Sequence, residues 1–383
     1  MGKGKNDKSV PEIVEISKKI PCCKSLEEQV EIMEAYTETF RKNSDKSVAR
    51  REVECLKILF PKMFRPIEKQ DLVIGRSDVL PIGLGCVTSV GGVGHYCVFS
   101  KMEQLRQQTD DENLIERLNA LESFWDENDT RSLFYNERLT ETTMGKFVDA
   151  KYPALITARL SGTFLNYPKL VRLGISGMER EIKECMEKET DEEKLDLYEC
   201  FLDCMKIFRD SIEFHKEMCR EELDKTDDAE RKQQLEILIN ALENILVRKP
   251  ETMIEGIELT WIFSLLSSVV NYGRLDVYLG ELLKHDLDHH LYTEEMAVKY
   301  ICSFFKLLEA RRSNVNGRVV LGGKDRENKE AGDLFCKVAI KALMINKDIE
   351  PQVTLRIYEG MDQEIYDLAI DAIATGCTYP MLY

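Results

Sequence analysis

The chain has 383 residues, 43% of them hydrophobic, which is enough to bury one large domain or two ordinary ones. With 69 acidic and 53 basic residues its formal net charge is −16, so no sequence-wide field attracts nucleic acid or an anionic membrane surface. Its 12 cysteines follow no signal peptide, and no apolar run approaches a membrane-spanning length. We therefore expect a cytoplasmic protein with reduced thiols that binds neither nucleic acid nor membrane.

Residues 1–150 are predicted to form a lead-in of helices and loops. Apolar residues recur at helical intervals from Ser9 to about Pro66, and again around Trp125. The adjacent pair Cys22–Cys23 has no neighbouring histidine or helix start to activate it, so both thiols are expected to act as small hydrophobic residues.

The stretch from Leu72 to Phe99 is rich in glycine and valine and predicts loops with short strands. Its glycines between Gly83 and Gly94 suggest a nucleotide-binding loop, but no Gly-Lys-Ser/Thr follows them and their spacing does not fit the dinucleotide fingerprint. We favour tight turns beside a cavity, with His95 and Tyr96 as polar groups on them. A structural role for His95 is the simpler of the two readings.

The run from Lys151 to Gly177 predicts an apolar strand, a turn at Ser161 and a helix. Arg159 stands in the apolar part of this run, so it needs an anionic partner, either an internal carboxylate or a bound anion. The internal partner is the simpler interpretation.

Residues 178–250 are predicted to be helical throughout. Two stripes of apolar residues recur at helical spacing. They are Phe201, Met205, Phe208, Ile212, His215 and Cys219, then Leu235, Leu238, Ile239, Leu242, Ile245 and Leu246.

The stretch from Trp261 to Leu291 starts with an apolar run, Trp261–Val270, that is short enough to be a core helix, and it places Arg274 and Asp276 beside an apolar helix. His285 and His289 are four residues apart, a spacing that can hold a metal on one helix face. No third ligand is specified, so we favour a solvated helix end and expect no metal site. Thr293 is placed to cap the helix that follows.

The last 66 residues repeat one unit. A β-branched strand at Arg318–Leu321 is followed by a helix over Asp333–Asn346, and an alternating strand that includes Val353, Leu355 and Ile357 is followed by a helix capped by Asp362. Gly376 ends that helix, and Pro380–Tyr383 is predicted to be the next strand. This pattern is typical of parallel strands joined by crossover helices.

Several of these runs, in this order, resemble one known family. They are Asn271–Leu279, Val319–Gly323 followed by Ala331–Leu343, and Pro351–Arg356 followed by Ala374–Pro380. They are similar to the N-terminal half of glycyl radical enzymes of the pyruvate formate-lyase type. Arg274, Asp276, Gly322, Gly323 and Arg356 form the structural signature of this resemblance.

The resemblance implies an α/β fold: the N-terminal half of a ten-stranded glycyl-radical-enzyme-type α/β barrel, with helices and the first half-barrel over residues 151–383. It implies a dimeric enzyme, a lyase or acyltransferase of anaerobic metabolism, that cleaves a C–C, C–O, C–N or C–S bond of a small-molecule substrate. A radical SAM activating enzyme would install the radical on a glycine, and a cysteine would carry it to the substrate. Both radical residues belong to the family's C-terminal half, which includes the glycyl radical domain, so we assign no catalytic residue and no bound cofactor here. We expect a C-terminal half or complementary subunit as partner.

The candidate substrate-binding residues are His95, Tyr96, Arg159, Ser161, Asn166 and Tyr167. Many diol dehydratases of the family carry Gly-His where this chain has Ser161–Gly162, a departure that argues against a plain diol dehydratase. His95 is a candidate replacement for the absent imidazole. The alternative hypothesis is a catalytically inactive truncated protein or a helical interaction protein.

Overall fold

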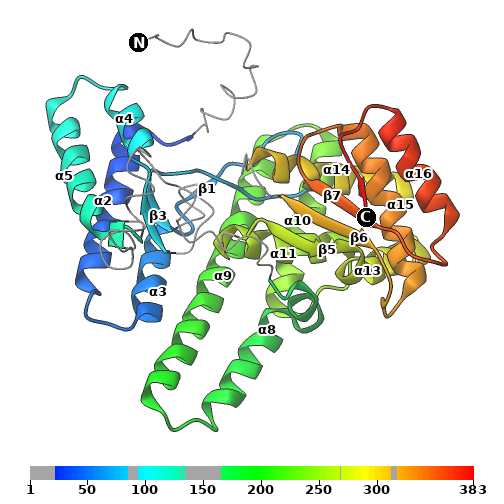
Figure 1. Cartoon of the computed structure of the whole chain (residues 1–383), viewed down its shortest axis with the longest axis horizontal. Coiled ribbons are helices and arrows are strands. Elements are labelled where there is room, and N and C mark those ends of the chain that lie inside the picture. Colours follow the sequence, from blue (N-terminus) through cyan, green and yellow to red (C-terminus); the bar gives the residue numbers. More distant parts are fainter. Residues whose placement is uncertain (1–21, 85–93, 131, 134–164, 268, 312–316) are drawn as a thin grey trace, which may run out of the picture.

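The computed structural model describes residues 22–84, 94–130, 132–133, 165–267, 269–311 and 317–383. Three regions follow one another along the chain (Figure 1). The lead-in helices lie at one end, a pair of long helices projects from the middle, and a parallel sheet with its own helices lies at the other end.

The lead-in contains four helices and two short antiparallel strand pairs in the described residues. The helices are α2 (Leu26–Lys42), α3 (Val48–Leu59), α4 (Phe99–Arg106) and α5 (Glu112–Asn128), and the strands are β1 (Phe64–Arg65) with β2 (Arg76–Ser77) and β3 (Ile82–Leu84) with β4 (His95–Cys97). Ser25 begins α2 with a reciprocal capping box to Glu28, which satisfies two otherwise free backbone amides. The predicted helices and the loop-and-strand character of residues 72–99 are confirmed where the structure describes them.

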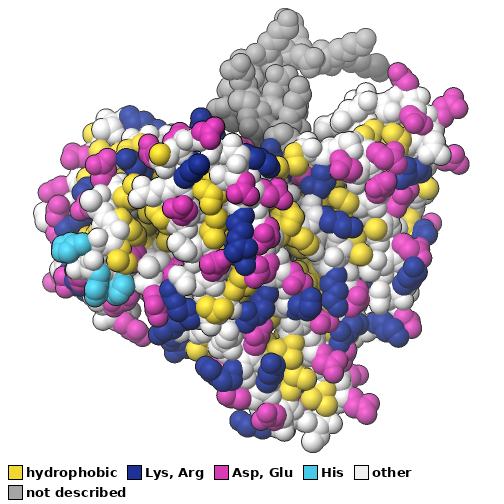
Figure 2. Space-filling view, turned by 180° about the vertical axis from the view of Figure 1, so that it is seen from behind, with side chains coloured by type: hydrophobic (Ala, Val, Ile, Leu, Met, Phe, Trp, Pro, Cys, Tyr) yellow, Lys and Arg dark blue, Asp and Glu magenta, His cyan; other side chains and the backbone are white. Residues whose placement is uncertain are grey.

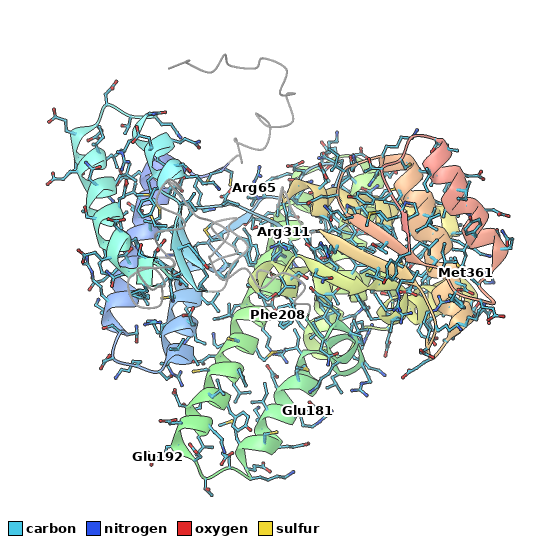
Figure 3. All side chains as sticks on the ribbon, in the orientation of Figure 1. Arg65, Glu181, Glu192, Phe208, Arg311 and Met361 are labelled. Atoms are coloured by element: carbon cyan, nitrogen blue, oxygen red, sulfur yellow. The ribbon has the colours of Figure 1, made fainter. Side chains whose placement is uncertain are left out.

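Long helices form the middle of the chain. They are α8 (Tyr167–Met186), α9 (Glu192–Lys225), α10 (Ala229–Val247) and α11 (Met253–Ser267). Glu181 and Glu192 lie near the free end of the α8–α9 hairpin, whereas Phe208 lies where α9 meets the body of the protein (Figure 3). The helical prediction for residues 178–250 is confirmed. Phe201 is an exception to its predicted stripe: it is largely exposed, because α9 is partnered on only part of its circumference near this end.

The sheet region alternates strands and helices. Its elements are β5 (Asn271–Arg274), α12 (Leu275–Tyr278), α13 (Gly280–Asp288), α14 (Glu294–Ala310), β6 (Arg318–Gly322), α15 (Lys329–Asn346), β7 (Gln352–Arg356), α16 (Gln363–Ala374) and β8 (Met381–Leu382). The strands are parallel in the order β5-β6-β7-β8. The prediction of strand, helix, strand, helix, strand over the last 66 residues is therefore confirmed.

Two details of that prediction need correction. Helix α15 begins at Lys329, four residues before the predicted Asp333, because the Asn328 side chain caps it. Ile357 lies beyond the end of β7 and is substantially exposed, since the strand ends at Arg356.

An extended strap, Glu68–Asp78, connects the lead-in to the sheet region. The Ser303 hydroxyl accepts the Leu72 amide at 2.9 Å, the Glu258 carboxyl group accepts the Ile74 amide at 2.9 Å, and Trp261 donates to the Gly75 carbonyl at 2.8 Å. Between Leu72 and Gly75 the strap's backbone is therefore bonded by side chains of α11 and α14, and the following Arg76–Ser77 pairs with β1.

Among the described residues, no helix has the length and apolar character needed to cross a bilayer. Acidic and basic side chains are interspersed over the face of the protein that Figure 2 shows.

Candidate functional site at the carboxyl ends of the parallel strands

The four strands run in the same direction, so their carboxyl ends meet at one edge of the sheet. Arg274 ends β5, Gly322 ends β6 and Arg356 ends β7. Gly322 and Arg356 are directly paired in the strand register. In open parallel sheets ligands bind at this edge, which makes it the candidate site.

Asp276 is the buried centre of this edge. Its Oδ2 accepts the Gly322 amide at 3.2 Å and an Arg326 guanidinium N–H at 3.3 Å, and Arg274 lies 3.8 Å away. Burial raises the pKa of Asp276 from 3.8 to about 6, although Arg274 and Arg326 both oppose that shift. The Oδ1 atom has no hydrogen-bond partner among the described residues.

The Arg326 side chain contacts three parts of the sheet region: α12, α15 and the segment that follows β7. Besides Asp276 it donates to Asp333 on α15 at 2.5 Å and to the hydroxyl of Tyr358, just after β7, at 2.8 Å. Its side chain is only 3% exposed. The sequence did not single out Arg326, because it stands in a polar loop without periodicity; its position three residues after Gly323 is the available signal.

Two glycines, Gly322 and Gly323, allow the end of β6 to approach Arg356 at the end of β7 closely. Gly322 and Gly323 have φ of +72° and +88°, which side chains rarely adopt. A Cβ on Gly322 would lie 2.8 Å from the Arg356 carbonyl oxygen, and one on Gly323 would lie 3.4 Å from the Arg356 side chain. The structure therefore brings together the five signature residues that the sequence singled out.

The two faces of the sheet differ. Val319, Leu321, Val353 and Leu355 are fully buried against the helices. Apart from the buried Gly322, the residues that alternate with them are half-buried or exposed, and on β6 and β7 they include no carboxylate: Arg318, Val320, Gln352, Thr354 and Arg356. We call this second surface the open face.

The predicted substrate-binding residues lie elsewhere or outside the described residues. His95 is 4% exposed and lies among α2, α3 and α5, where Nδ1 is 2.5 Å from the Tyr36 hydroxyl, Nε2 is 2.7 Å from Glu52 and the ring stacks on Trp125. Tyr96 is also buried in this region. Both His95 nitrogens are occupied within the chain, so a substrate contact by His95 stays a prediction that the geometry does not favour.

Of the other predicted substrate-binding residues, two are described by the structure and two are not. Asn166 is exposed and caps α8 by accepting the Lys169 amide at 3.2 Å. Tyr167 is fully buried, with its hydroxyl 2.8 Å from Ser264 Oγ and its ring stacked on Tyr278. Arg159 and Ser161 lie outside the described residues.

Comparison with known proteins decides the family. A model of the family described as pyruvate formate lyase-like matches residues 6–383. The chain belongs to this family.

The relatives of this pyruvate formate lyase-like chain are glycyl radical enzymes. A curated (2S)-3-sulfopropanediol dehydratase of Klebsiella oxytoca is 22% identical over 274 residues, which cover 66% of this chain and 33% of the relative. A solved structure on 1,2-propanediol dehydration in Roseburia inulinivorans matches with a TM-score of 0.76 at 17% identity, over 99% of this chain and 50% of that one. The glycerol-bound B12-independent glycerol dehydratase of Clostridium butyricum matches with a TM-score of 0.73 at 19% identity, over 97% and 50%.

These matches support an α/β, mostly helical fold for this pyruvate formate lyase-like chain. The chain spans about half the length of the solved relatives and a third of the curated one. The resemblance stated from the sequence is thereby confirmed at the level of the family.

The cysteines of this pyruvate formate lyase-like chain are free thiols in the described residues. Burial raises the pKa of Cys55 to about 12, and Cys377 donates to the Leu343 carbonyl at 3.6 Å behind α16. Burial raises the pKa of the Cys23 thiol, and its 3.1 Å hydrogen bond to Asp78 raises that pKa further.

The histidines at the end of α13 do not form a metal site in the part of the chain that the structure describes. The His285 and His289 rings lie 4.2 Å apart, and Nδ1 of His289 is 2.8 Å from the His285 carbonyl oxygen. Figure 2 shows a histidine cluster at one edge of the surface.

Proposed function

We propose that the chain supplies the first half of a glycyl radical enzyme that cleaves a bond of a small molecule, and that a complementary half carries the thiyl cysteine and the radical glycine. The observation that supports the proposal is the parallel sheet, one face of which stays half-buried or exposed among the residues that the structure describes. Parallel sheets are normally covered on both faces, so the open face calls for further structure.

The edge of this sheet supports the same proposal. At the β8 edge Met381 is 55% exposed and Tyr383 is 85% exposed. An unpaired strand edge is a template for pairing with another strand. We propose that a strand of the complementary half, whether continuous with this polypeptide or separate, pairs there and extends the sheet toward the ten-stranded barrel.

The residues of this chain would bind and orient the substrate. In the proposed enzyme the open face forms one wall of the cavity, and the Asp276–Arg326 pair fixes the strand ends that border it. The radical residues supply hydrogen abstraction, and bond cleavage follows. Because the named relatives are dehydratases, C–O cleavage is the first reaction to test, with 1,2-propanediol, glycerol and 3-sulfopropanediol as substrates.

Activation tests the proposal directly. The chain would be co-purified anaerobically with a complementary half that carries the radical glycine in an Arg-Val-x-Gly-Tyr segment. The complex would then be incubated with a radical SAM activating enzyme and S-adenosylmethionine. We expect a glycyl radical doublet by electron paramagnetic resonance in the complex and no doublet in this chain alone. We also expect the assembled enzyme to be a dimer, each subunit of which is made of both halves.

The controls separate the alternatives. A full-length relative activated in parallel shows that the activating enzyme works. If that control gives a doublet while the assembled halves give none, the inactive or interaction-protein hypothesis is favoured. A doublet in this chain alone would contradict the assignment of the radical glycine to the complementary half.

A further inference from the structure

A groove lies between helices α10 and α14, apart from the strand ends. It encloses about 710 Å³, and its floor is made by Leu72 of the strap and by Thr252, Ile254 and Glu255 at the start of α11. This volume is in the range of natural ligand sites. None of the strand-end residues described above lines it.

One wall is a row of side chains on α10, most of them amides. The row comprises Glu230, Gln233, Gln234, Ile237, Asn240, Ala241 and Asn244. Its ends are about 21 Å apart at the rise of an α-helix, which is the length of about six extended residues. Gln233 and Asn240 are exposed and make no side-chain hydrogen bond to a described residue, so their amides face outward with both donor and acceptor available.

The other wall is apolar and aromatic. Tyr292, Met296 and Tyr300 are spaced four apart along one face of α14 and the residues before it, and the two tyrosine rings meet edge to face at 5.5 Å. Tyr292 donates its hydroxyl to Asp286. Tyr300 is 4% exposed, yet its hydroxyl has no hydrogen-bond partner among the described residues, and burial raises its pKa. Because Tyr300 lines the groove, its hydroxyl is available to donate a hydrogen bond to an occupant.

The charge of the residues that line the groove limits the kinds of ligand that it can bind. The residues that line the groove include no lysine or arginine. Glu255 is paired with Arg248 at 2.7 Å and accepts a hydrogen bond from the Asn244 amide at 2.8 Å, whereas Glu230 lies at one end of the α10 row. Phosphate, nucleotide and acidic ligands therefore find no counter-charge here.

We propose that this groove binds an extended peptide segment, about six residues long and uncharged or basic, with one bulky apolar side chain packed against Tyr292, Met296 and Tyr300. Side-chain amides both donate and accept, as a peptide backbone does, so Gln233 and Asn240 can bond an extended strand laid beside α10. Tyrosine and methionine supply the adaptable apolar contact that protein interfaces favour. The proposal is independent of radical chemistry.

A phage-displayed library of random octapeptides, selected against the whole chain, tests it. We expect enriched sequences to contain one aromatic or large aliphatic residue and few acids. A synthetic peptide of the enriched sequence would then be titrated by calorimetry. Tyr300→Phe, which removes only the hydroxyl, should weaken that peptide about three- to tenfold, and Gln233→Ala with Asn240→Ala about tenfold or more.

Asn240→Trp closes the mouth of the groove and should abolish binding. The matched control is Gln104→Trp, which places the same side chain at an exposed amide position on α4 and should leave binding unchanged. Circular dichroism and thermal melting of each variant establish that it is folded. No enriched sequence, enriched peptides that bind the Asn240→Trp variant as they bind the parent chain, or enrichment for acidic peptides would each overturn the proposal.

Discussion

The Arg326 guanidinium lies 3.3 Å from the Asp276 carboxylate at the carboxyl ends of β5 and β6, and both side chains are almost fully buried. The contact joins residues that are 50 apart in the chain. It fixes the loop after β6 to helix α12, which follows β5, and through Asp333 to helix α15.

Replacing Arg326 with methionine should be strongly destabilising. The change leaves Asp276 and Asp333 without their shared guanidinium, and breaking a buried ion pair costs about 3–5 kcal/mol. Urea unfolding monitored by circular dichroism measures the loss. Lys206→Met, which removes a mostly exposed pair with Asp210, is the matched control and should cost less than about 0.5 kcal/mol. Equal losses would show that the buried network does not stabilise the strand ends.

The ionisation of Asp276 should appear in the pH dependence of stability. Its pKa is about 6 in the folded chain against 3.8 ordinarily, so between these values the folded chain binds more protons than the unfolded chain. Rising pH therefore lowers the free energy of unfolding across this window, by about 3 kcal/mol for this one group. The stability is fully present below pH 3.8 and is lost as the pH rises through 6.

Asp276→Asn removes this titration. We expect the free energy of unfolding of the parent chain, relative to this variant, to fall between about pH 4 and pH 7, as measured by urea titrations at closely spaced pH values. Comparing the two proteins cancels other raised groups such as Glu258. A difference that does not change with pH would show that Asp276 is already ionised at pH 4.

The strands with regular alternation could be predicted from the sequence, but β5 could not. β6 and β7 carry β-branched and aliphatic residues at every second position, and these are the buried positions. β5 is Asn-Tyr-Gly-Arg, its Gly273 has φ of +61°, and its register with β6 is interrupted by a bulge. Its pairing depends on residues more than 40 positions away, which no local pattern encodes.

In the candidate site, too, some residues could be predicted from local sequence and others depend on distant parts of the chain. Arg274, Asp276 and the two glycines could be singled out because they stand in short runs beside predictable elements. His95 was singled out because a glycine-rich neighbourhood suggests a cavity, but its partners Tyr36 and Glu52, which come from helices 59 and 43 residues away, could not be read from that neighbourhood. A buried histidine's partners are set by tertiary packing.

Gly174 should tolerate alanine poorly. Its φ is +64°, and an added Cβ would lie 2.8 Å from the Lys249 backbone, which cannot move as a side-chain tip can. Gly360 offers a matched control, since its φ is +84° but a Cβ there meets nothing within 4 Å. Gly360→Ala should cost only the conformational strain, about 1–2 kcal/mol. Gly174→Ala adds overpacking, for a total of about 3 kcal/mol or more by urea unfolding. Equal costs at the two positions would mean that the chain near Lys249 yields freely.

Val319 and Val320 test the two faces of the sheet with one substitution. Val319 is fully buried against the helices, so Val319→Thr places a hydroxyl among apolar groups and should cost about 1–3 kcal/mol of unfolding free energy. Val320 is half-buried on the open face, so Val320→Thr should cost less than about 0.5 kcal/mol.

In an enzyme assembled from both halves, Val320→Thr should affect activity more than Val319→Thr does, which is the reverse of their order in stability. Val320→Thr changes the polarity of the wall that the proposed function assigns to the substrate, so kcat/KM should change at least about threefold while the unfolding midpoint stays constant. Val319→Thr should lower the unfolding midpoint and leave kcat/KM per folded molecule unchanged. If Val320→Thr alters neither quantity, the open face of β6 does not border the substrate, and the cavity must be sought on another surface of the assembled enzyme.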